Sequence, residues 1–378
     1  MTEIYLVRHT EAEGNLYKMM QGHWDGNVTP LGRCEVAALA ERFRNIHIDA
    51  VYSSDLFRSV ITATALAGEG QEIIEDKRLR EINVGPWEGE FFGNLMQNEP
   101  ESLQVFMKDM ASWHIDGAET FDEVQERMVV AVSEIAGKHK GQTIGITSHG
   151  VAILCFMAKI LEKGYNDIPI PRNTAVTKLW FDGEKFFVDY YDDGSHLEDL
   201  GVGRWVPNQG LRDEELNPKT DRELYCSCYE DAWKLAHNGS TEGFRADDYF
   251  RQAVQHQRVD SRAVLKLYDG DRFAGIVDLD TERGRNEGYG WVSFLYLKPE
   301  FRGKRLGPQL LARAYMHYEK LGRQSVRLCV NENNSPAIEF YERYGFIHID
   351  SKKSGSGEVL VMDRNLKGDR NLSSEKLV

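Results

Sequence analysis

The run Ile4-Tyr5-Leu6-Val7, followed at once by Arg8-His9, constrains this chain more than any other stretch. Consecutive apolar residues of this kind are typical of a strand that is buried on both faces of a sheet. In an open parallel sheet, ligands bind at the carboxyl ends of the strands. The sequence therefore puts an arginine and a histidine where a ligand would bind, although a solvated basic turn is also compatible with this pattern.

A histidine at such a position can attack phosphorus if other parts of the chain supply the groups it needs. Its imidazole must be neutral, with one nitrogen free and the proton of the other held by an acceptor. The transferred phosphoryl group needs cations and hydrogen-bond donors around its oxygens, and the leaving oxygen needs an acid. A second arginine, a second histidine and a carboxyl group at other strand ends would meet this need.

The second histidine follows a run of β-branched residues. Thr143 to Ser148 reads as a strand, which ends in His149-Gly150 and turns directly into an apolar helix from Val151 to Leu161. A lone histidine is usually structural. Two histidines at equivalent strand-to-helix junctions instead indicate a shared site.

The second arginine and the carboxyl group also have candidates. Ala50-Val51-Tyr52 reads as a short strand, and Ser53-Ser54-Asp55 after it offers helix caps and N–H groups suited to an anion. Arg58 falls in the first turns of that helix, and Glu81 precedes a tight loop rich in glycine and proline. The alternatives are a solvated surface residue for Arg58 and a salt-bridged loop residue for Glu81.

Length and composition limit the kind of protein. A chain of 378 residues favours two domains, and a net charge of -14 argues against nonspecific nucleic-acid binding. No apolar run approaches the ~18 residues of a membrane span, and no secretory signal opens the sequence. Five scattered cysteines then favour reduced thiols and a cytoplasmic location, and we interpret the pair Cys226-x-Cys228 as structural.

The first half, residues 1 to about 195, resembles the histidine phosphatase superfamily, which is also called phosphoglycerate mutase-like. Four motifs of that family occur in the family order. They are matched by Arg8-His9-Thr10-Glu11-Ala12 with Asn15 and Gln21-Gly22, by Ser53 to Arg58, by Arg80 to Gly89, and by Ser148-His149-Gly150. Thr10 and Ala12 depart from the opening motif but flank the histidine and leave its chemistry intact.

The resemblance implies a three-layer α/β/α fold and a role for each candidate. His9 would be the nucleophile that forms a phosphohistidine, and Glu81 would protonate the leaving group and then activate water. The phosphoryl oxygens would be held by Arg8, Arg58 and His149, with Asn15 and Gln21 as further contacts to phosphate or substrate. Neither a metal nor a cofactor is implied for this domain, because the arginines supply the positive charge.

The family contains both phosphatases and mutases. Mutases usually carry a longer insert that covers the substrate, whereas this half is compact, which favours hydrolysis of a small phosphomonoester and leaves a mutase as the alternative. Phe91, Phe92, Met96 and Trp113 fit a substrate cap and core packing equally well.

The second half begins near residue 200. Val202 to Val206 is a possible first strand, and Leu211 to Pro218 is strongly charged. Periodicity then predicts the helices Leu224 to His237 and Asp247 to Gln257, the strands Ala263 to Tyr268 and Phe273 to Leu279 joined by the hairpin signal Asp269-Gly270-Asp271, and a longer strand Tyr289 to Lys298.

A basic, glycine-bearing turn from Pro299 to Gly307 follows that strand and precedes a helix from Leu310 to Leu321. A strand, such a turn and a helix N-terminus form a cradle for a diphosphate, because backbone N–H groups and the helix dipole point at the anion. An ordinary basic loop is the alternative. The remaining predicted elements are a strand Ser325 to Val330, a helix within Asn331 to Gly345, and a strand Val359 to Met362.

Residues 200 to about 365 resemble the GNAT acyl-CoA N-acetyltransferases. The match runs through Leu295 to Gly307, and then through Asn334, Ala337, Tyr341 and Gly345-Phe346. The resemblance implies acetyl-CoA as the cofactor, with Tyr341 protonating the departing thiolate. It assigns pyrophosphate binding to Arg302, Gly303, Lys304, Arg305, Leu306 and Gly307, pantetheine pairing to Leu295 and Leu297 where two strands splay apart, and a place in the same motif to Asn334.

Two positions depart from the GNAT pattern. Arg305 stands where the motif usually has glycine, although its side chain can still reach a phosphate. The strand also lacks the acidic residue often used as a base, since Trp291 and Ser293 occupy that region; Glu287 or a water chain are possible substitutes. The sequence therefore supports coenzyme binding more strongly than acetyl transfer.

The sequence thus predicts an α/β protein with a histidine phosphatase domain over 1–199, a GNAT domain over 200–366 and a disordered tail over 367–378. We expect a phosphatase for a small phosphoester joined to an acetyltransferase for a small-molecule or peptide amine, without nucleic-acid or membrane partners. A noncatalytic acyl-CoA sensor is the alternative for the second domain, and two consecutive reactions on one metabolite are a third possibility. The sequence leaves both substrates and the oligomeric state open.

Overall fold

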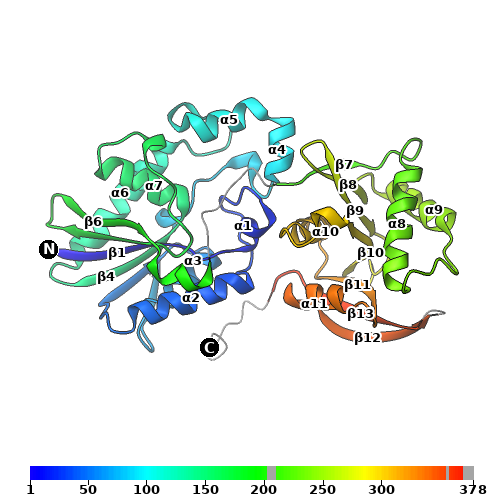
Figure 1. Cartoon of the computed structure of the whole chain (residues 1–378). Coiled ribbons are helices and arrows are strands. Elements are labelled where there is room, and N and C mark those ends of the chain that lie inside the picture. Colours follow the sequence, from blue (N-terminus) through cyan, green and yellow to red (C-terminus); the bar gives the residue numbers. More distant parts are fainter. Residues whose placement is uncertain (202–209, 355–356, 369–378) are drawn as a thin grey trace. The chain divides into compact units, whose positions relative to one another are not determined.

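The computed structural model describes residues 1–201, 210–354 and 357–368, and the contacts divide them into two units (Figure 1). Of these residues, unit 1 contains 1–90 and 95–201, and unit 2 contains 91–94 together with the rest from 210 onward. The possible strand Val202 to Val206 and the tail beyond residue 368 lie outside the described residues. The two units are described separately below.

Unit 1 is built on a six-stranded mixed sheet. Its strands β1 to β4 are parallel, whereas β5 runs antiparallel to β1 and β6 antiparallel to β5. In spatial order the strands are β3 (Ile73–Glu75), β2 (Ala50–Ser53), β4 (Thr143–Ser148), β1 (Thr2–Arg8), β5 (Val176–Phe181) and β6 (Phe186–Asp193). In the β1–β4 pair, Arg8 lies beside Ser148. The residues that follow these two strands, His9 and His149, therefore emerge at the same edge of the sheet.

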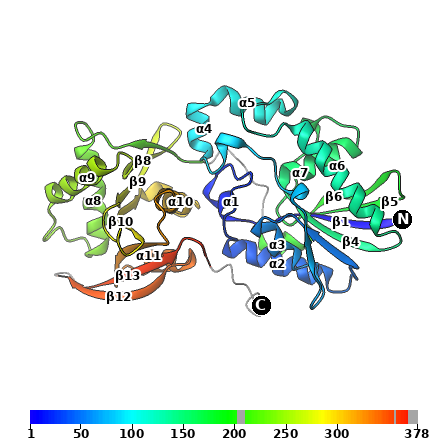
Figure 2. The same cartoon turned by 180° about the vertical axis from the view of Figure 1, so that it is seen from behind.

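Helices cover both faces of this sheet, as Figures 1 and 2 show from opposite sides. The helices α2 (Pro30–Phe43) and α3 (Phe57–Ala63) lie on one face, where Tyr5 and Val7 join their apolar residues in one buried cluster. The other face carries α6 (Phe121–Lys138) and α7 (Gly150–Ile160), because alternate strand residues point to opposite sides. The unit therefore has the expected three layers.

Shorter helices complete unit 1 and its loops. They are α1 (Glu13–Tyr17), α5 (Pro100–Lys108) and the 3₁₀ turns η1 (Lys77–Leu79), η2 (Gly85–Trp87), η3 (Met110–Ser112), η4 (Tyr165–Asp167) and η5 (Ser195–Leu200). The helix α4 (Phe92–Asn98) begins in unit 2 and ends in unit 1. The helix α1 interrupts the polar segment after β1. Trp113 packs against the rings of Trp87 and Phe106, with ring centroids 5.4 and 4.9 Å away, whereas Met96 is 49% exposed. Trp113 is therefore a core residue.

The helix caps show where local sequence signals decide the structure and where they do not. The hydroxyl of Thr29 accepts the N–H of Gly32 at 3.0 Å and caps α2. The prediction that Ser53-Ser54-Asp55 caps α3 is wrong, because the N-cap residue is Leu56 and makes no side-chain cap. Asp25, from a loop distant in sequence, instead accepts the N–H of Phe57 at 2.9 Å.

Unit 2 contains a seven-stranded sheet in which only the β10–β11 pair is parallel. Its spatial order is β12 (Ile347–Ser354), β13 (Gly357–Asn365), β11 (Ser325–Asn331), β10 (Tyr289–Leu297), β9 (Arg272–Asp280), β8 (Val264–Asp269) and β7 (Arg212–Glu215). Within this unit one face is covered by α8 (Arg222–Ala236) and α9 (Ala246–Val259), and the other by α10 (Gly307–Lys320) and α11 (Ser335–Arg343); the 3₁₀ turn η7 (Pro299–Phe301) precedes α10 (Figure 1).

A bulge in β10 opens this sheet. The pairing of β10 with β9 shifts register between Val292 and Phe294, so Ser293 is the extra residue. The parallel pairing of β10 with β11 ends at the same point, with Val292 beside Leu328. A bulge bends the strand that carries it and raises its local twist. The two strands consequently diverge in the region where the sequence predicted a splay.

Two strands of unit 2 were not predicted. Arg212 to Glu215 forms β7, an edge strand that pairs only with β8, although all four residues are charged. Its charges are compensated by ion pairs, because Asp213 pairs with Arg262 and Arg313, and Glu214 pairs with Arg212 and Lys266. The second unpredicted strand, β12, forms the opposite edge of the sheet.

In the described part of the chain, no helix has the length and apolar character needed to cross a membrane.

Candidate active sites

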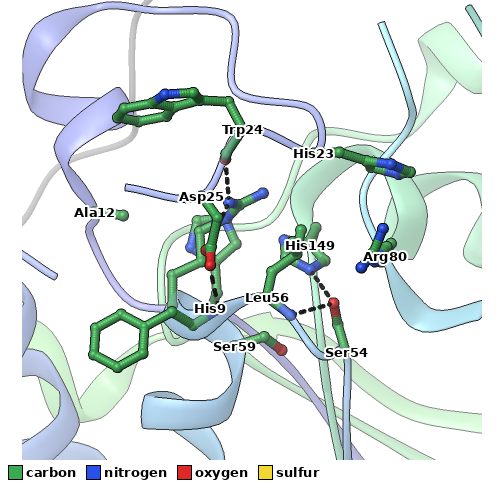
Figure 3. A network of polar contacts seen from close by, with 12 residues as sticks. His9, Ala12, His23, Trp24, Asp25, Ser54, Leu56, Ser59, Arg80 and His149 are labelled. Carbon is green, nitrogen blue, oxygen red and sulfur yellow. Dashed lines mark hydrogen bonds and ion pairs between the residues drawn. The ribbon is translucent and has the colours of Figure 1, made fainter. Parts of the chain in front are cut away.

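The first candidate site lies where β1 and β4 end. The rings of His9 and His149 approach each other there, with centroids 5.0 Å apart (Figure 3). Both residues are buried. The neighbouring register of the two parallel strands thus brings together the two histidines that the sequence analysis singled out.

His9 is held as a neutral imidazole with one free nitrogen. Its Nδ1 lies 2.7 Å from the carbonyl oxygen of Thr10, which can only accept a hydrogen bond, so Nδ1 carries the proton and Nε2 keeps its lone pair. Burial, and then the nearby charges of Arg58 and Arg8, hold the pKa of His9 well below its usual range. The backbone is fixed as well, because Asn173 Nδ2 donates to the His9 carbonyl at 2.9 Å.

Arg58 is fully buried rather than solvated. Its two terminal nitrogens donate to the carbonyls of Trp24, at 2.8 Å, and Gly22, at 2.7 Å. Asp25 is the nearest carboxylate, 3.8 Å away. Burial lowers the pKa of Arg58 to about 10, which still leaves the guanidinium charged at neutral pH. Its Nε has no hydrogen-bond partner within the described residues.

Arg8 is the second buried guanidinium, and it donates to the carbonyl of Pro171 at 2.6 Å. Its Nε also lacks a partner in the described structure, and burial lowers its pKa. A Cβ at position 150 would lie 3.3 Å from the Arg8 guanidinium carbon and 2.9 Å from Ile170. The glycine of the Ser-His-Gly motif therefore leaves room for this arginine.

His149 is the N-cap residue of α7, and only one of its two ring nitrogens has a hydrogen-bond partner among the described residues. Its Nε2 lies 2.9 Å from the hydroxyl of Ser54, whereas Nδ1 is buried without a partner among the described residues. Burial, followed by the charge of Arg58, holds the pKa of His149 well below its usual range. Each of the three cationic or imidazole groups that the sequence assigned to phosphate thus has a buried nitrogen available for a ligand.

Glu81 lies at the amino end of α7. One carboxylate oxygen accepts the N–H of Ala152 at 2.9 Å and that of Ile82 at 3.1 Å, while the other accepts the N–H of Val151 at 3.2 Å. These three N–H groups fix the position of the Glu81 carboxyl group at the helix end. Because α7 starts directly after His149, the same helix end places the acid candidate beside the second histidine.

Asn15 and Gln21 occupy the loop that follows β1. The side-chain oxygen of Asn15 accepts the N–H of Ala12 at 3.0 Å, which closes the start of α1. The side-chain oxygen of Gln21 is buried without a partner in the described structure. A Cβ on Gly14 would lie only 2.1 Å from the Gln21 side chain, so this loop is tightly packed.

The sequence analysis missed Glu35, a buried carboxyl group on α2. Its Oε2 accepts the Thr10 hydroxyl at 2.8 Å and the N–H of Glu11 at 2.7 Å. Burial raises the pKa of Glu35 to about 7. Thr10 departs from the family motif, and its hydroxyl is one of the groups that Glu35 holds. Glu35 therefore supports the residue whose carbonyl orients His9.

Arg127, on α6, was also missed, and no motif marks it. It donates to the carbonyls of Arg78, at 2.9 Å, Arg80, at 2.7 Å, and Glu81, at 2.9 Å. The carboxylate of Glu119 holds the same guanidinium at 2.7 Å. One side chain therefore fixes the main chain on which Glu81 sits.

The second candidate site is the turn between β10 and α10. Gly303 has a φ of +72° and Arg305 a φ of +58°, so the turn contains two left-handed residues. In the described structure, no hydrogen bond uses the N–H groups of residues 303 to 307. Free N–H groups beside a helix N-terminus are suited to an anion. A Cβ at Gly307 would lie 2.8 Å from the ring of Phe340, so this glycine permits α10 to pack closely.

A cavity of about 940 Å³ follows the divergence of β10 from β11. Leu295, Asn334 and Tyr341 line this cavity, and the packed surroundings raise the pKa of the Tyr341 phenol to about 12. Leu297 is not part of the lining, and its carbonyl accepts the Nε of Arg302 at 2.7 Å. The structure thus brings three of the predicted residues to one cavity, and the fourth, Leu297, contacts Arg302 in the turn before α10.

A smaller cavity of about 250 Å³ shares lining residues with the larger one, among them Tyr229, Ser293 and Cys329. Its walls include the aromatic and charged residues Tyr225, Tyr249, His256, Asp278, Arg283 and Trp291. Glu287, the substitute base considered from the sequence, is exposed and lines neither of these two cavities. Within the described residues, no cluster of three or more His, Cys, Asp or Glu side chains could hold a metal ion.

Comparison with known families and proteins identifies one family in each half of the chain. Residues 4–194 match the histidine phosphatase superfamily (branch 1), and residues 222–346 match the acetyltransferase (GNAT) family. Phosphoglycerate mutase-like protein 4 of Arabidopsis thaliana is 32% identical over 203 residues, which are 53% of this chain and 88% of the relative. A metal-independent phosphoserine phosphatase of the same plant is 31% identical over 205 residues, covering 53% of this chain and 85% of the relative.

A solved structure shows the same likeness. Bacillus stearothermophilus YhfR is 32% identical, with a TM-score of 0.50, and the match covers 52% of this chain and all of that one. The matching family regions coincide with the two sites, since His9 to His149 fall in the first and the turn of residues 303 to 307 in the second. The chain therefore belongs to the histidine phosphatase superfamily and carries a GNAT acetyltransferase domain in its second half.

Proposed function

We propose that unit 1 hydrolyses a small phosphomonoester through a phosphohistidine on His9. The observation that carries this proposal is the state of His9, a neutral imidazole whose Nδ1 proton is held by Thr10 while Nε2 is free. Two buried guanidiniums with unpartnered Nε atoms accompany it in the described structure. These are the requirements for attack on phosphorus, in which little besides positioning and charge stabilisation is asked of the protein.

In the first step, His9 Nε2 forms a bond to phosphorus as the bond to the ester oxygen breaks. Arg8, Arg58 and His149 hold the phosphoryl oxygens, and the carboxyl group of Glu81 gives its proton to the leaving oxygen. In the second step, Glu81 takes a proton from water, whose oxygen attacks phosphorus and releases His9 and inorganic phosphate. The side-chain cations supply the positive charge, so we propose that this domain works without a metal.

Hydrolysis is preferred over a mutase reaction because the segment between η2 and α6 contains only the short helices α4 and α5 and the 3₁₀ turn η3. The named relatives include both phosphoserine phosphatases and mutase-like proteins, so the substrate must be measured. A phosphate-release screen across phosphoamino acids, sugar phosphates and nucleotides identifies a phosphatase. Transfer of labelled phosphate between positions of one substrate, without release, would instead identify a mutase.

His9→Ala tests the nucleophile directly. We expect this variant to lose phosphate release and the acid-labile phosphohistidine that wild-type protein carries during turnover. His47→Ala is the matched control, because the His47 side chain is 86% exposed. Near-wild-type turnover by His9→Ala, with the fold intact by circular dichroism, would contradict the assignment.

For unit 2 we propose transfer of an acetyl group from acetyl-CoA to an amine. The residues present fit this coenzyme: residues 303 to 307 offer free N–H groups to its pyrophosphate, and Arg302, Lys304 and Arg305 add positive charge. The large cavity at the splay, with Leu295 and Asn334, suits the pantetheine arm. Acetyl-CoA supplies an activated thioester, and Tyr341 supplies a phenolic proton at the same cavity.

Two variants separate a transferase from a noncatalytic acyl-CoA sensor. Gly303→Glu puts a carboxylate and a Cβ into the turn, so calorimetry should show strongly weakened acetyl-CoA binding. Tyr341→Phe should keep affinity within a few-fold and lower thiol release across an amine panel, because its proton is needed only as the thiolate leaves. Tyr344→Phe, at the C-cap of the helix that carries Tyr341 but outside the cavity lining, is the control. Binding without any turnover by wild-type protein would identify a sensor.

A further inference from the structure

The smaller cavity of unit 2 contains a paired histidine and carboxylate that no motif predicts. Nδ1 of His256, from α9, lies 2.7 Å from Asp278 Oδ1, on β9. Asp278 is buried, with 1% exposure, and its second oxygen accepts the hydroxyl of Tyr225 at 2.7 Å. Because both carboxylate oxygens are committed as acceptors, His256 carries its proton on Nδ1 in the neutral form.

The other ring nitrogen is available to an incoming molecule. Nε2 of His256 lies 3.6 Å from Asp280 Oδ2, which is longer than a hydrogen bond, and the side chain retains 15% exposure. His256 lines the cavity that shares Ser293 and Cys329 with the larger, splay-side cavity. A group bound beside His256 therefore lies next to the space that suits the thioester end of acetyl-CoA.

An amine acceptor arrives as an ammonium ion and must lose a proton before it can attack. In the GNAT pattern the strand often supplies the base, but here Trp291 and Ser293 occupy that region. We propose that the smaller cavity is the acceptor site, that His256 Nε2 is the base that takes the proton from the acceptor, and that Asp278 orients the ring. This proposal rests on the acetyl transfer proposed above and adds the acceptor site to it.

The cavity also indicates the class of acceptor. Arg283 is exposed and stacks on Trp291, with its guanidinium carbon 3.3 Å from the ring centroid, and its side chain makes no hydrogen bond within the described residues. Guanidinium groups recognise carboxylates through paired hydrogen bonds. About 250 Å³ is below the ~300–1,000 Å³ of drug-sized sites. The acceptor is therefore a small amino acid, whose ammonium faces His256 and whose carboxylate meets Arg283.

The proton balance assigns both protons that the acceptor gives up. The ammonium passes one to His256 Nε2, from which it leaves to solvent. The neutral nitrogen then forms a bond to the acyl carbon as the carbon–sulfur bond of the thioester breaks. The second proton released by the nitrogen balances the one that the Tyr341 hydroxyl gives to sulfur, so the products are an N-acetyl amino acid, a free thiol and one proton.

The groups around His256 set its pH dependence. Asp278 and Asp280 face it from β9, Tyr225 and Tyr229 from α8, and Arg283 from the following loop. Burial lowers the pKa of His256, but the hydrogen bond and charge of Asp278 outweigh burial, and the net shift is upward from 6.5. Because only the neutral ring accepts a proton, turnover rises with pH through a midpoint above 6.5.

The experiment compares His256→Gln with a matched control, His317→Gln. His317 also pairs with a carboxylate, since its Nε2 lies 2.7 Å from Asp260 Oδ2, but it lines neither cavity. We expect His256→Gln to lower thiol release with amino acids by ~10²–10⁴-fold, to lose the pH limb, and to keep acetyl-CoA affinity by calorimetry. His317→Gln should keep the rate and the pH profile.

Two further measurements test the parts of the proposal separately. Asp278→Asn should lower the pKa of the His256 imidazole, because the carboxylate that raises this pKa is lost. NMR titration of the imidazole without coenzyme measures the change. Each amino acid should also be a better acceptor than its decarboxylated amine, such as serine against ethanolamine, by at least tenfold, and Arg283→Gln should remove that preference.

The outcomes distinguish this proposal from the function on which it rests. If wild-type protein binds acetyl-CoA but acetylates no amine, both the transferase function and this acceptor site fail. If it acetylates amines and His256→Gln keeps the rate and pH profile, the base assignment alone is overturned. Equal rates with serine and ethanolamine would overturn the amino-acid class and leave the base in place.

Discussion

The two proposed anion sites of this chain use different parts of the protein. In unit 1 the groups are side chains, namely two buried arginines and two buried histidines brought to one sheet edge by separate elements. In unit 2 they are main-chain N–H groups of residues 303 to 307, in a single turn before α10. The identity of each side chain thus decides the first site, whereas backbone conformation decides the second. This explains how Arg305 can replace a motif glycine without removing the cradle.

Glu81→Gln should produce the largest effect and tests how far unit 1 depends on a side chain. Loss of a general acid typically lowers the rate by ~10²–10⁴-fold. We expect this loss with alkyl phosphates, and a small effect with p-nitrophenyl phosphate, whose leaving group needs little protonation. The ratio of the two rates is the measurement. An equal loss on both substrates would give Glu81 another role.

Arg58→Gln removes a buried charge of the first site. Loss of one preorganised donor at a developing charge costs ~10²–10³-fold in turnover. Phosphate release should fall by this amount, while acetyl-CoA binding to unit 2 stays unchanged in the same preparation. Arg44→Gln is the control, because Arg44 has a side-chain exposure of 66%. A variant that keeps wild-type phosphatase kinetics would remove Arg58 from the site.

The burial of a carboxyl group in unit 1 also makes the free energy of unfolding depend on pH, and Glu35→Gln tests this dependence. Glu35 has its pKa raised to about 7, so between its ordinary value and pH 7 the folded protein binds a proton that the unfolded chain has lost. Stability from this group is therefore present at low pH and lost as pH rises through 7. Gln keeps the acceptor oxygen for Thr10 without the charge.

We therefore expect Glu35→Gln to raise the free energy of unfolding of unit 1 at pH 8 by on the order of 1–3 kcal/mol. At pH 5 the difference from wild type should be much smaller. Denaturant unfolding at the two pH values, followed by a probe in unit 1, measures it. A difference that grows toward low pH would contradict the assigned direction of the shift.

Arg305→Gly should produce the smallest effect. It tests whether the anion site of unit 2 depends on main-chain N–H groups rather than on this side chain. Arg305 has a φ of +58°, and the left-handed conformation costs a non-glycine residue about 1–2 kcal/mol. Glycine removes this strain but gains freedom in the unfolded chain, so stability should rise by no more than about 1 kcal/mol. Acetyl-CoA affinity, by calorimetry, should fall only a few-fold. A loss as large as that of Gly303→Glu would show that the side chain is the main contact.

The difference between a site made of side chains and one made of main-chain groups also explains which residues could be predicted from the sequence. The residues of unit 1 follow strands or begin helices, so periodicity and four local motifs place His9, Arg58, Glu81 and His149 at one sheet edge. The groups that support them are not readable in this way. Glu35 and Arg127 reach the site from helix faces where a charged residue is ordinarily solvated, and Asp25 crosses from another loop to take the N–H that Ser53-Ser54-Asp55 was expected to cap.

In unit 2 the proposed coenzyme-binding turn is local in sequence and could be predicted, but the proposed acceptor cavity could not. His256 and Asp278 belong to separate elements, α9 and β9, and meet only because α9 packs on that strand. The bulge at Ser293 could not be predicted from the residues of β10 alone, because it is defined by the register of β10 against β9. The charged strand β7 resembled a linker, because the partners that neutralise it, Arg262, Lys266 and Arg313, are distant in sequence.

The divergence of β10 from β11 has a consequence for the handling of this protein. Past Val292 the sheet has, in effect, an edge in its middle, with main-chain groups of β10 left without a neighbouring strand on that side. Unpaired main-chain N–H and C=O groups along a strand can pair with any extended chain, including a segment of another copy, and so promote aggregation. We expect the amide hydrogens of Leu295 and Leu297, which face away from β9, to exchange faster without acetyl-CoA. Bound coenzyme should cover these groups and keep the protein monodisperse during storage.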